Sequence, residues 1–390
     1  MRTGVKDTIL LTGATGALGS MLLHRLSDQG YDVVCLVRAK SPGEARRRIR
    51  DLIGERENVR AVRGDITEPR CGISDLDREL LVGRVKRILH CAASINFTDK
   101  NETQVTNVAG MLNVLELMDV LDAWHIIHVS TAYVVGDAPF LSENSLSLGQ
   151  RWHNPYEESK FIGEKMVRAW ALKRDDRRFT ILRPSILVGC EDGTTPTLDA
   201  VYTYLEPLHR VAESLRAHRE RPLPPDVSLR SDGRISIPLA VVMANQHINY
   251  VPIDWVADMM AATVDLPPCN ETFHFVHPHP PRLRECFDWS LQYLKLDGIV
   301  LCSTQRARDL AVQTQSALVR RLQRRVDVVH DAFRPYCTHD PRFELEAAPR
   351  RLATRYRPPP IIDQKFLERM LSYVRQWYWD VDRKRNRVDA

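Results

Sequence analysis

The stretch DTILLTGATGALG, residues 7–19, combines a short apolar run with three glycines spaced three residues apart. The apolar run ends directly at the first of these glycines, Gly13, which is typical of a buried strand. From about Leu18 to Gln29 the apolar residues recur at helical spacing. Glycines between the two elements permit a tight turn and close packing of the helix on the strand. The stretch therefore predicts a strand, a glycine-rich turn and a helix.

Apolar stretches of similar length recur along the first half of the chain, at residues 31–38, 58–65, 85–93, 124–131 and 179–189. Helical patterns separate them, including VTNVAGMLNVLELMDVL and a helix that opens with NPYEESKFIGEK (154–165). Short apolar strands that alternate with helices indicate a parallel sheet covered on both faces. We therefore expect an α/β fold with a Rossmann-type doubly wound parallel sheet and a smaller, mostly helical C-terminal part.

The glycine-rich turn also has the form of a nucleotide-binding turn, G-x-x-G-x-x-G. Glycines let the backbone approach a pyrophosphate, and the helix that follows directs unpaired N–H groups and a positive end at the anion. A turn kept glycine-rich only for packing is the alternative, but its place between a strand and a helix favours the nucleotide. The residues expected to contact the cofactor here are Thr12, Gly13, Thr15, Gly16, Ala17, Leu18 and Gly19.

The end of the second strand indicates which dinucleotide binds. An acidic residue there would favour NAD, but this chain has Arg38, and Arg46, Arg47 and Arg48 follow shortly after. A guanidinium suits a 2′-phosphate, so we expect NADPH, with Arg38 and Arg48 as ligands. The alternative for the triplet of Arg46, Arg47 and Arg48 is a solvated helix face, which we expect to hold for at least one of the three. Beyond the third strand, Asp65 and Ile66 are expected beside the adenine.

Tyr156 and Lys160 lie four residues apart at the start of a predicted helix, so both side chains address one face. Such a pair occurs by chance in many helices, as an ordinary aromatic residue and a surface charge. The fifth strand, however, ends in Ser130 and Thr131, at the sheet edge where such folds bind ligands. Two hydroxyls, a phenol and an ammonium are thereby expected at one place.

With a G-x-x-G-x-x-G turn, a strand that ends in S-T and a Y-x-x-x-K helix in this order, residues 7–280 resemble the extended short-chain dehydrogenase/reductase superfamily. The resemblance implies that Thr131, five residues before Gly136, holds the substrate oxygen and that Tyr156 protonates it. Lys160 would bind the nicotinamide ribose. Its charge, together with that of the positively charged nicotinamide, would lower the pKa of Tyr156, which is near 10 in a free phenol.

The same resemblance implies further cofactor contacts at the ends of the fourth, fifth and sixth strands. Asn107, in TNVAG, matches a position whose role in the superfamily is structural or in a proton relay. The remaining expected contacts are Cys91, Ala92, Ala93, Asn107, Ser130, Pro184, Ser185 and Ile186.

Three narrower segments resemble fatty acyl-CoA reductases and carrier-protein thioester reductases. They are CLVRAKSPGEARRRI (35–49), HCAASINFT (90–98) and INYVPIDWVADMM (248–260). The resemblance implies NADPH-dependent reduction of an acyl thioester, bound to a carrier protein or to CoA, to an aldehyde and then in some members to an alcohol. Each segment could instead serve only to pack the fold.

Two alternatives stay open at this point. An extended short-chain dehydrogenase acting on a ketone or hydroxyl of a steroid-like or nucleotide-sugar substrate would use the same three residues, although Arg38 argues against its usual NAD. A non-catalytic NADP-sensing scaffold would usually have lost Tyr156 or Lys160, and both are present.

We expect a four-part organisation of the chain. Residues 1–200 form the NADP-binding domain, 201–247 a substrate loop or flap, 248–280 strand and cap segments that return to the core, and 281–390 a helical region for substrate or carrier docking. Helices are expected around 284–295 and 304–332, and a loop at 218–234. Arginine outnumbers acidic residues between 306 and 357, which indicates either a solvated helical surface or a site for an acidic carrier or the phosphates of CoA.

The composition of the chain argues against several other kinds of protein. The net charge of +5 over 390 residues comes without a nucleic-acid-binding motif, and no apolar run is long enough to span a membrane. The eight cysteines are scattered, which argues against a disulfide framework or a metal site and favours the cytoplasm. No adenylation or carrier domain is recognisable, so we expect a carrier-bound substrate to arrive in trans. Homodimerisation, common in the superfamily, is a further expectation.

Overall fold

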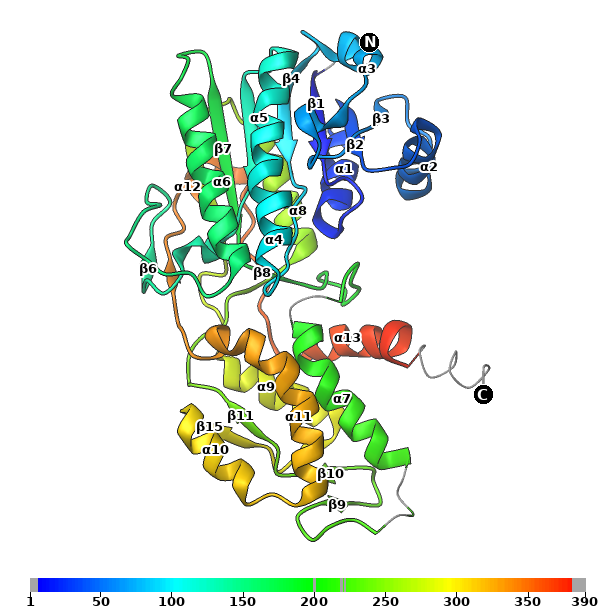
Figure 1. The fold of residues 1–390 in the computed structure, drawn as a ribbon, viewed down its shortest axis with the longest axis vertical. Helices are drawn as coiled ribbons and strands as arrows, with labels where there is room; N and C mark the ends of the chain where they lie inside the picture. Colours follow the sequence, from blue (N-terminus) through cyan, green and yellow to red (C-terminus); the bar gives the residue numbers. More distant parts are fainter. Residues whose placement is uncertain (1–5, 199–200, 218–219, 221, 381–390) are drawn as a thin grey trace. The chain divides into compact units, whose positions relative to one another are not determined.

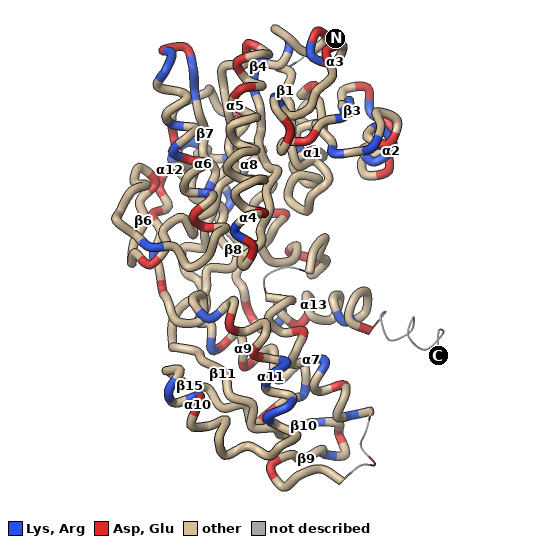
Figure 2. Tube along the Cα trace, in the orientation of Figure 1, with Lys and Arg blue, Asp and Glu red and all other residues tan. Residues whose placement is uncertain are grey.

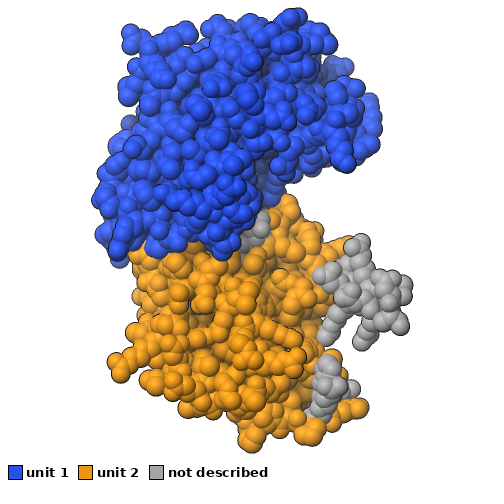
Figure 3. Space-filling model, in the orientation of Figure 1, with its two compact units in different colours: residues 1–185, 253–276, 341–359 blue, residues 186–252, 277–340, 360–390 orange. Residues whose placement is uncertain are grey.

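The computed structural model describes residues 6–198, 201–217, 220 and 222–380 (Figure 1). The chain divides into two compact units, coloured separately in Figure 3. The first comprises residues 1–185, 253–276 and 341–359, and the second comprises 186–252, 277–340 and 360–390. The four-part division expected from the sequence remains a prediction, because it assigns roles as well as boundaries.

The first unit is built on a seven-stranded parallel sheet with the order β13-β7-β5-β4-β1-β2-β3. The strands are β1 (Lys6–Thr12), β2 (Tyr31–Val37), β3 (Val59–Arg63), β4 (Val85–His90), β5 (His125–Val129), β7 (Arg178–Pro184) and β13 (Glu271–Phe275). The strand order reverses direction between β1 and β4, and ligands of doubly wound sheets bind at the carboxyl ends of the strands beside such a point. The expected Rossmann-type sheet is confirmed.

Helices cover the sheet on both faces (Figure 1). Leu10, Ile88 and Ile126 share one hydrophobic core with α5 (Gly110–Leu121) and α6 (Pro155–Ala171). Their neighbours Ile9, Leu89 and Ile127 point to the opposite face and are equally buried, beneath α1 (Ala17–Asp28) and α8 (Ile253–Val264). Burial on both faces explains why these strands are almost continuously apolar in sequence.

Shorter elements connect the strands of the first unit. These are α2 (Pro42–Ile53), η1 (Pro69–Gly72), α3 (Asp75–Leu81), α4 (Lys100–Thr103), η2 (Gln104–Ala109), η3 (Ala132–Val135), β6 (Phe140–Leu141), β16 (Arg342–Phe343), α12 (Ala347–Leu352) and η5 (Ala353–Arg355). Strand β16 pairs with β6 in parallel, so the late segment 341–359 belongs to this unit.

The second unit is mostly helical, as expected for the C-terminal part. Its α-helices are α7 (Val201–Ala217), α9 (Leu283–Leu294), α10 (Gln305–Gln313), α11 (Ala317–Phe333) and α13 (Gln364–Val374). The short helix η4 (Arg334–Cys337) follows α11, and η6 (Arg375–Trp379) follows α13. Short strands complete it: β8 (Ile186–Val188), β9 (Ser228–Leu229), β10 (Ile235–Ser236), β11 (Ala240–Val242), β12 (Tyr250–Pro252), β14 (Leu296–Asp297) and β15 (Val300–Cys302). Apolar side chains of α7, α9, α11 and α13 form one hydrophobic core.

Several elements differ from the sequence expectations. The sixth strand, expected over 179–189, ends at Pro184, and the chain then forms β8 in the second unit, paired with β12. The segment 201–247, expected as a loop or flap, begins with the 17-residue helix α7, and the expected loop 218–234 contains β9 in its described part. Residues 218, 219 and 221 lie outside the described residues. The fifth strand stops at Val129, which leaves Ser130 and Thr131 in the loop beyond it.

Among the residues described, no helix has both the length and the apolar character that crossing a membrane would require.

Candidate active site

The glycine-rich turn joins β1 to α1 at the carboxyl edge of the sheet. Gly13 has a φ of +75°, and a Cβ added to it would lie 2.6 Å from the backbone nitrogen of Ala92. A Cβ on Gly19 would lie 2.0 Å from the Gly13 carbonyl oxygen, so the helix can pack here only without a side chain. Gly16, the N-cap of α1, leaves the first amides of the helix without a side-chain partner. This cradle fits the pyrophosphate of a dinucleotide.

Thr12 fastens the turn to the end of β4. Its hydroxyl hydrogen-bonds His90 Nδ1 at 2.8 Å and accepts from the Ala92 backbone N–H at 3.2 Å, and the Cys91 N–H donates to the Thr12 carbonyl at 3.3 Å. The segment of Cys91, Ala92 and Ala93 therefore lies beside the glycine turn, where the sequence analysis expected it. The Thr12 hydroxyl is fully used inside the protein.

A pocket of about 390 Å³ lies where β2 and β3 end. Its lining residues are Arg38, Ala39, Lys40, Glu44, Arg63, Gly64, Asp65 and Glu68. The Arg48 guanidinium donates to the Arg38 carbonyl at 2.6 Å and to the Thr15 hydroxyl at 3.4 Å. The structure thus brings together Arg38, Arg48, Asp65 and Thr15. Ile66 is buried, and its carbonyl accepts from Asn113 at 2.8 Å.

Two positively charged side chains, Arg38 and Lys40, favour an anion at their side of this pocket. Arg38 and Lys40 are exposed, and no carboxylate of the described residues lies within 4.0 Å of either side chain. Arg63, by contrast, lies 3.7 Å from Glu68 and donates to the Ala39 carbonyl at 3.1 Å. Two cations without a partner fit a 2′-phosphate. The sequence analysis missed Lys40, although its place two residues after Arg38 was a usable signal.

Thr131, Tyr156 and Lys160 converge beyond the end of β5. Thr131 caps η3, its hydroxyl accepts from the Tyr133 N–H at 3.2 Å, and a hydrogen bond joins it to the Tyr156 phenol. Lys160 Nζ donates to the Val129 carbonyl at 2.8 Å. Helix α6 starts at Pro155, with the Asn154 side chain accepting from the Glu157 N–H, and this cap sets where the pair lies.

Burial has the largest effect on the pKa values of Tyr156 and Lys160. Burial raises the pKa of Tyr156, and the hydrogen bond from Thr131 offsets only part of that effect. Burial lowers the pKa of Lys160 to about 8. The carboxylate of Glu157 and the thiol of Cys91 also raise the pKa of Tyr156, by less than burial does. Tyr156 is therefore protonated at neutral pH, the form that a proton donor requires.

Asn107 joins three segments around the pair. Its Nδ2 donates to the Ser94 carbonyl at 2.9 Å and to the Ser159 hydroxyl at 2.8 Å, and its Oδ1 accepts from the Ser94 N–H at 2.8 Å. It lies in η2, a π-helical turn, where the sequence pattern predicted regular helix, and such turns are frequent at functional sites. The contacts give Asn107 a positioning role between the 91–98 loop and α6.

Ser130 belongs to a buried ionic network below the site. Its hydroxyl donates to Glu164 Oε1 at 2.6 Å, and Arg183 donates to both carboxylate oxygens of Glu164, at 2.8 and 2.7 Å. The Arg183 and Glu164 side chains are both 0% exposed. Arg183 also donates to the Ser145 carbonyl at 2.9 Å. Arg183 was not among the residues expected from the sequence. An arginine within the apolar part of a predicted strand is a usable signal, since a buried charge must be paired.

The remaining residues expected to contact the cofactor lie in both units of the chain. Cys91 is half-buried, and burial raises the pKa of its thiol to about 11, so it is not a thiolate at neutral pH. The Pro184 carbonyl accepts from the Thr131 hydroxyl at 3.5 Å, and the Ser185 N–H donates to the Phe275 carbonyl at 3.0 Å. Ile186 starts β8 in the second unit, and its contact with the cofactor stays a prediction.

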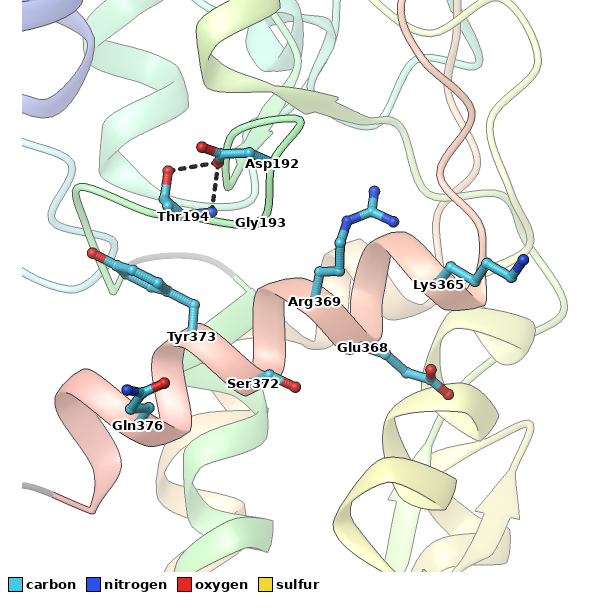
Figure 4. Close-up of a pocket in the computed structure, with 9 residues that line it drawn as sticks. All are labelled: Asp192, Gly193, Thr194, Lys365, Glu368, Arg369, Ser372, Tyr373 and Gln376. Carbon is cyan, nitrogen blue, oxygen red and sulfur yellow. Dashed lines mark hydrogen bonds between the residues drawn. The ribbon is translucent and has the colours of Figure 1, made fainter.

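The second unit has a polar pocket of its own, of about 620 Å³ (Figure 4). One wall is the turn 192–194, held by Asp192, whose Oδ1 accepts from the Thr194 N–H at 2.8 Å and from its hydroxyl at 2.7 Å. The other wall is α13 and the start of η6, and its lining side chains are Lys365, Glu368, Arg369, Ser372, Tyr373 and Gln376. Figure 4 shows Arg369 and Tyr373 directed to the side of the turn. The sequence analysis did not single out this pocket.

Known proteins that resemble this chain indicate its family. The family model described as male sterility protein matches residues 11–260. Peramine synthetase ppzA of Metarhizium majus (strain ARSEF 297) is 29% identical over 205 residues, which cover 49% of this chain and 7% of that protein. Fatty acyl-CoA reductase 1 of Mus musculus is 28% identical over 153 residues, which cover 35% of this chain and 30% of that protein. The chain thus spans a minor part of the length of both relatives.

A solved structure resembles the chain over nearly its whole length. The terminal R domain from the myxalamid PKS-NRPS biosynthetic pathway superposes with a TM-score of 0.73, at 24% identity, over 96% of this chain and 92% of that one. At this identity the likeness shows the fold. Because the family model covers well over half of the residues, the chain belongs to the male sterility protein family, a thioester reductase-like group of the extended short-chain dehydrogenase/reductase superfamily.

Proposed function

We propose that the protein is an NADPH-dependent reductase of acyl thioesters that uses Thr131, Tyr156 and Lys160. The observation that carries this proposal is the convergence of the three side chains beyond β5, with the Tyr156 phenol hydrogen-bonded to Thr131. Membership of a family whose relatives include a fatty acyl-CoA reductase supports the thioester as substrate.

The choice of NADPH over NADH rests on the pocket at the ends of β2 and β3. Arg38 and Lys40 supply two cations without a carboxylate partner among the described residues, and Arg48 holds the Arg38 backbone in place. A ribose 2′-hydroxyl would gain little from two cations, whereas a 2′-phosphate would be neutralised by them.

The proposed reaction starts at the thioester carbonyl. When bound, the reduced nicotinamide supplies a hydride to the carbonyl carbon. Thr131 holds the carbonyl oxygen by a hydrogen bond, and Tyr156 donates its phenolic proton to that oxygen as the new C–H bond forms. The hemithioacetal then loses its thiol: the C–S bond breaks, the oxygen returns its proton to the Tyr156 oxygen, and the sulfur leaves as a thiolate that takes a proton from solvent. Aldehyde, thiol and the oxidised cofactor are the products.

The acyl group is proposed to arrive as a carrier-protein or CoA thioester, bound in trans. The polar pocket of α13 and the turn 192–194 offers amide, hydroxyl and cationic groups suited to a phosphopantetheine arm, which has two amides and a phosphate. A second reduction, from aldehyde to alcohol, would use the same three residues.

The test is turnover of NADPH with a panel of acyl-CoA and acyl-carrier thioesters, with a thiol reagent as a second readout. We expect NADPH loss to be matched by thiol release and to be lost in Tyr156→Phe. One NADPH per thiol would indicate an aldehyde product and two would indicate an alcohol. NADPH binding without thiol release on any thioester, together with turnover of a steroid-like ketone or a nucleotide sugar, would replace this proposal with the ketone or hydroxyl alternative.

A further inference from the structure

Helix α11 of the second unit has an unusually one-sided charge. Arg320, Arg321, Arg324 and Arg325 are all exposed, whereas Val319, Leu322 and Val326 on the other side of the helix are buried in the core of the unit. Figure 2 shows these basic residues in blue along α11. We call the four arginines, with Val328, the α11 arginine face.

The arginines of this face are not neutralised by neighbours. No carboxylate of the described residues lies within 4.0 Å of the Arg321, Arg324 or Arg325 side chains, and Arg320 donates only to the Gln315 carbonyl. The nearby acids are used elsewhere: Asp327 pairs with Arg308, and Asp331 lies 3.6 Å from Arg334. The face therefore carries an uncompensated positive charge.

Spacing along the helix makes this arrangement costly for folding. Arg320 and Arg324 are four residues apart, as are Arg321 and Arg325, so each pair places like charges side by side on the surface. A helix face that is merely solvated usually alternates signs, as Glu206 and Arg210 do on α7, where the two side chains form an ion pair.

An apolar side chain lies at one end of the row of charges. Val328 is 80% exposed and follows Arg324 by four residues and Arg321 by seven, so it lies one turn beyond Arg324 on the same side of α11. Exposed apolar and charged side chains that lie next to each other are a usual composition of a protein–protein contact. The face is also convex, as an exposed helix is, so it cannot enclose a small phosphate ligand but can receive a second helix.

We propose that the α11 arginine face docks an acidic helix of the carrier protein that delivers the acyl thioester, with Val328 against an apolar residue of that helix. The inference rests on the proposed function, because it names the partner that brings the substrate. Complementary charge would speed the encounter and select against basic or neutral proteins.

The test compares one acyl group on three thiols: an acidic acyl-carrier protein, CoA and pantetheine. The variant is Arg321→Glu with Arg324→Glu. The matched control is Arg60→Glu with Arg84→Glu, two exposed arginines of the first unit that likewise have no carboxylate of the described residues within 4.0 Å. Thermal melting of both variants checks that each is folded.

We expect the KM for the acyl-carrier thioester to rise about tenfold in the α11 variant, with kcat unchanged and no change for acyl-pantetheine or acyl-CoA. The wild-type KM for the carrier substrate should also rise with salt, and the α11 variant should lose most of that dependence. The control variant should behave as wild type with all three substrates.

Three results would overturn the proposal. An equal loss with acyl-CoA would assign the face to the phosphates of CoA. No difference between the α11 variant and the control would show a solvated surface. Fluorescence anisotropy of the labelled holo-carrier gives an answer independent of turnover: unchanged affinity in the α11 variant would exclude docking. If the wild type reduces no thioester but the carrier still binds through α11, the proposed reaction fails and the docking surface stands.

Discussion

Arginine has opposite surroundings in the two units. In the first unit, Arg183 is fully buried, and the Glu164 carboxylate with which it pairs also binds Ser130, next to the candidate catalytic Thr131. In the second unit, the four arginines of the α11 arginine face are exposed, and none of them has a carboxylate partner among the described residues. A buried charge must be satisfied inside the protein, whereas an exposed charge remains available to a partner. The comparison predicts that changes in the first unit affect catalysis and stability and that changes in the second affect recognition.

The largest effect is expected at the phenol. Tyr156→Phe removes the proton donor but keeps the ring, so kcat should fall by about 10²–10⁴-fold. NADPH binding and the melting temperature should change little. The matched control is Tyr293→Phe on α9, a tyrosine that lines neither of the two pockets described, for which kcat should stay near that of the wild type. A Tyr156→Phe enzyme that keeps most of its kcat would remove Tyr156 from the proposed mechanism.

The buried network should dominate stability. Arg183→Leu leaves the buried Glu164 carboxylate with only the Ser130 hydroxyl and the more distant Arg168, 3.8 Å away, and we expect the free energy of unfolding to fall by about 3–5 kcal/mol in urea titrations. Adding Glu164→Leu should recover part of the loss, because the poorly compensated buried charge is then gone. Arg174→Leu removes a fully exposed arginine paired with Asp176 and should leave stability unchanged. If Arg183→Leu and Arg174→Leu were equally stable, the distinction between the two kinds of arginine would fail.

Lys160 should show a conflict between stability and activity. Its pKa is lowered by burial to about 8 from an ordinary 10.5, so below pH 8 the folded protein holds a cation that it disfavours. Lys160→Met should lower kcat, by less than Tyr156→Phe does, yet raise the free energy of unfolding at pH 7 by about 1–3 kcal/mol.

The pH dependence gives the control for Lys160. Between pH 8 and 10.5 the unfolded wild type keeps the proton that the folded form has lost, so wild-type stability should rise with pH by up to about 1.4 kcal/mol per unit. The advantage of Lys160→Met should therefore shrink through that window. An advantage that is constant with pH would show that the ammonium carries no desolvation cost.

The smallest effect is expected at the cofactor pocket. Arg38→Ala should raise the KM for NADPH about tenfold and leave the KM for NADH unchanged, because only the first carries a 2′-phosphate. Steady-state kinetics with both cofactors measures this, with Arg60→Ala as an exposed control on β3. An equal loss for both cofactors would mean that Arg38 supports the fold of the pocket and does not select the phosphate.

Much of the first unit followed from local pattern. Six of the seven strands and the glycine turn were predictable, because strands in a covered parallel sheet are largely apolar and a close backbone approach requires glycine. The seventh strand, β13, was not predicted as a separate strand from the sequence, because only its pairing with β7 in the folded protein identifies its five residues. The cofactor contacts and catalytic roles assigned from the sequence remain predictions that the proposed experiments test.

The sequence by itself determined the alternation of strand and helix, the glycine cradle, and the order in which Thr131, Tyr156 and Lys160 occur. Periodicity and turn chemistry act between near neighbours, so they are visible in the chain. Only the tertiary structure decided that Arg183 pairs with Glu164 and that the Lys160 ammonium turns to the Val129 carbonyl. These contacts join different elements of the fold, and the cost of leaving a buried charge or donor unpaired, which sets them, exists only once packing has removed the water.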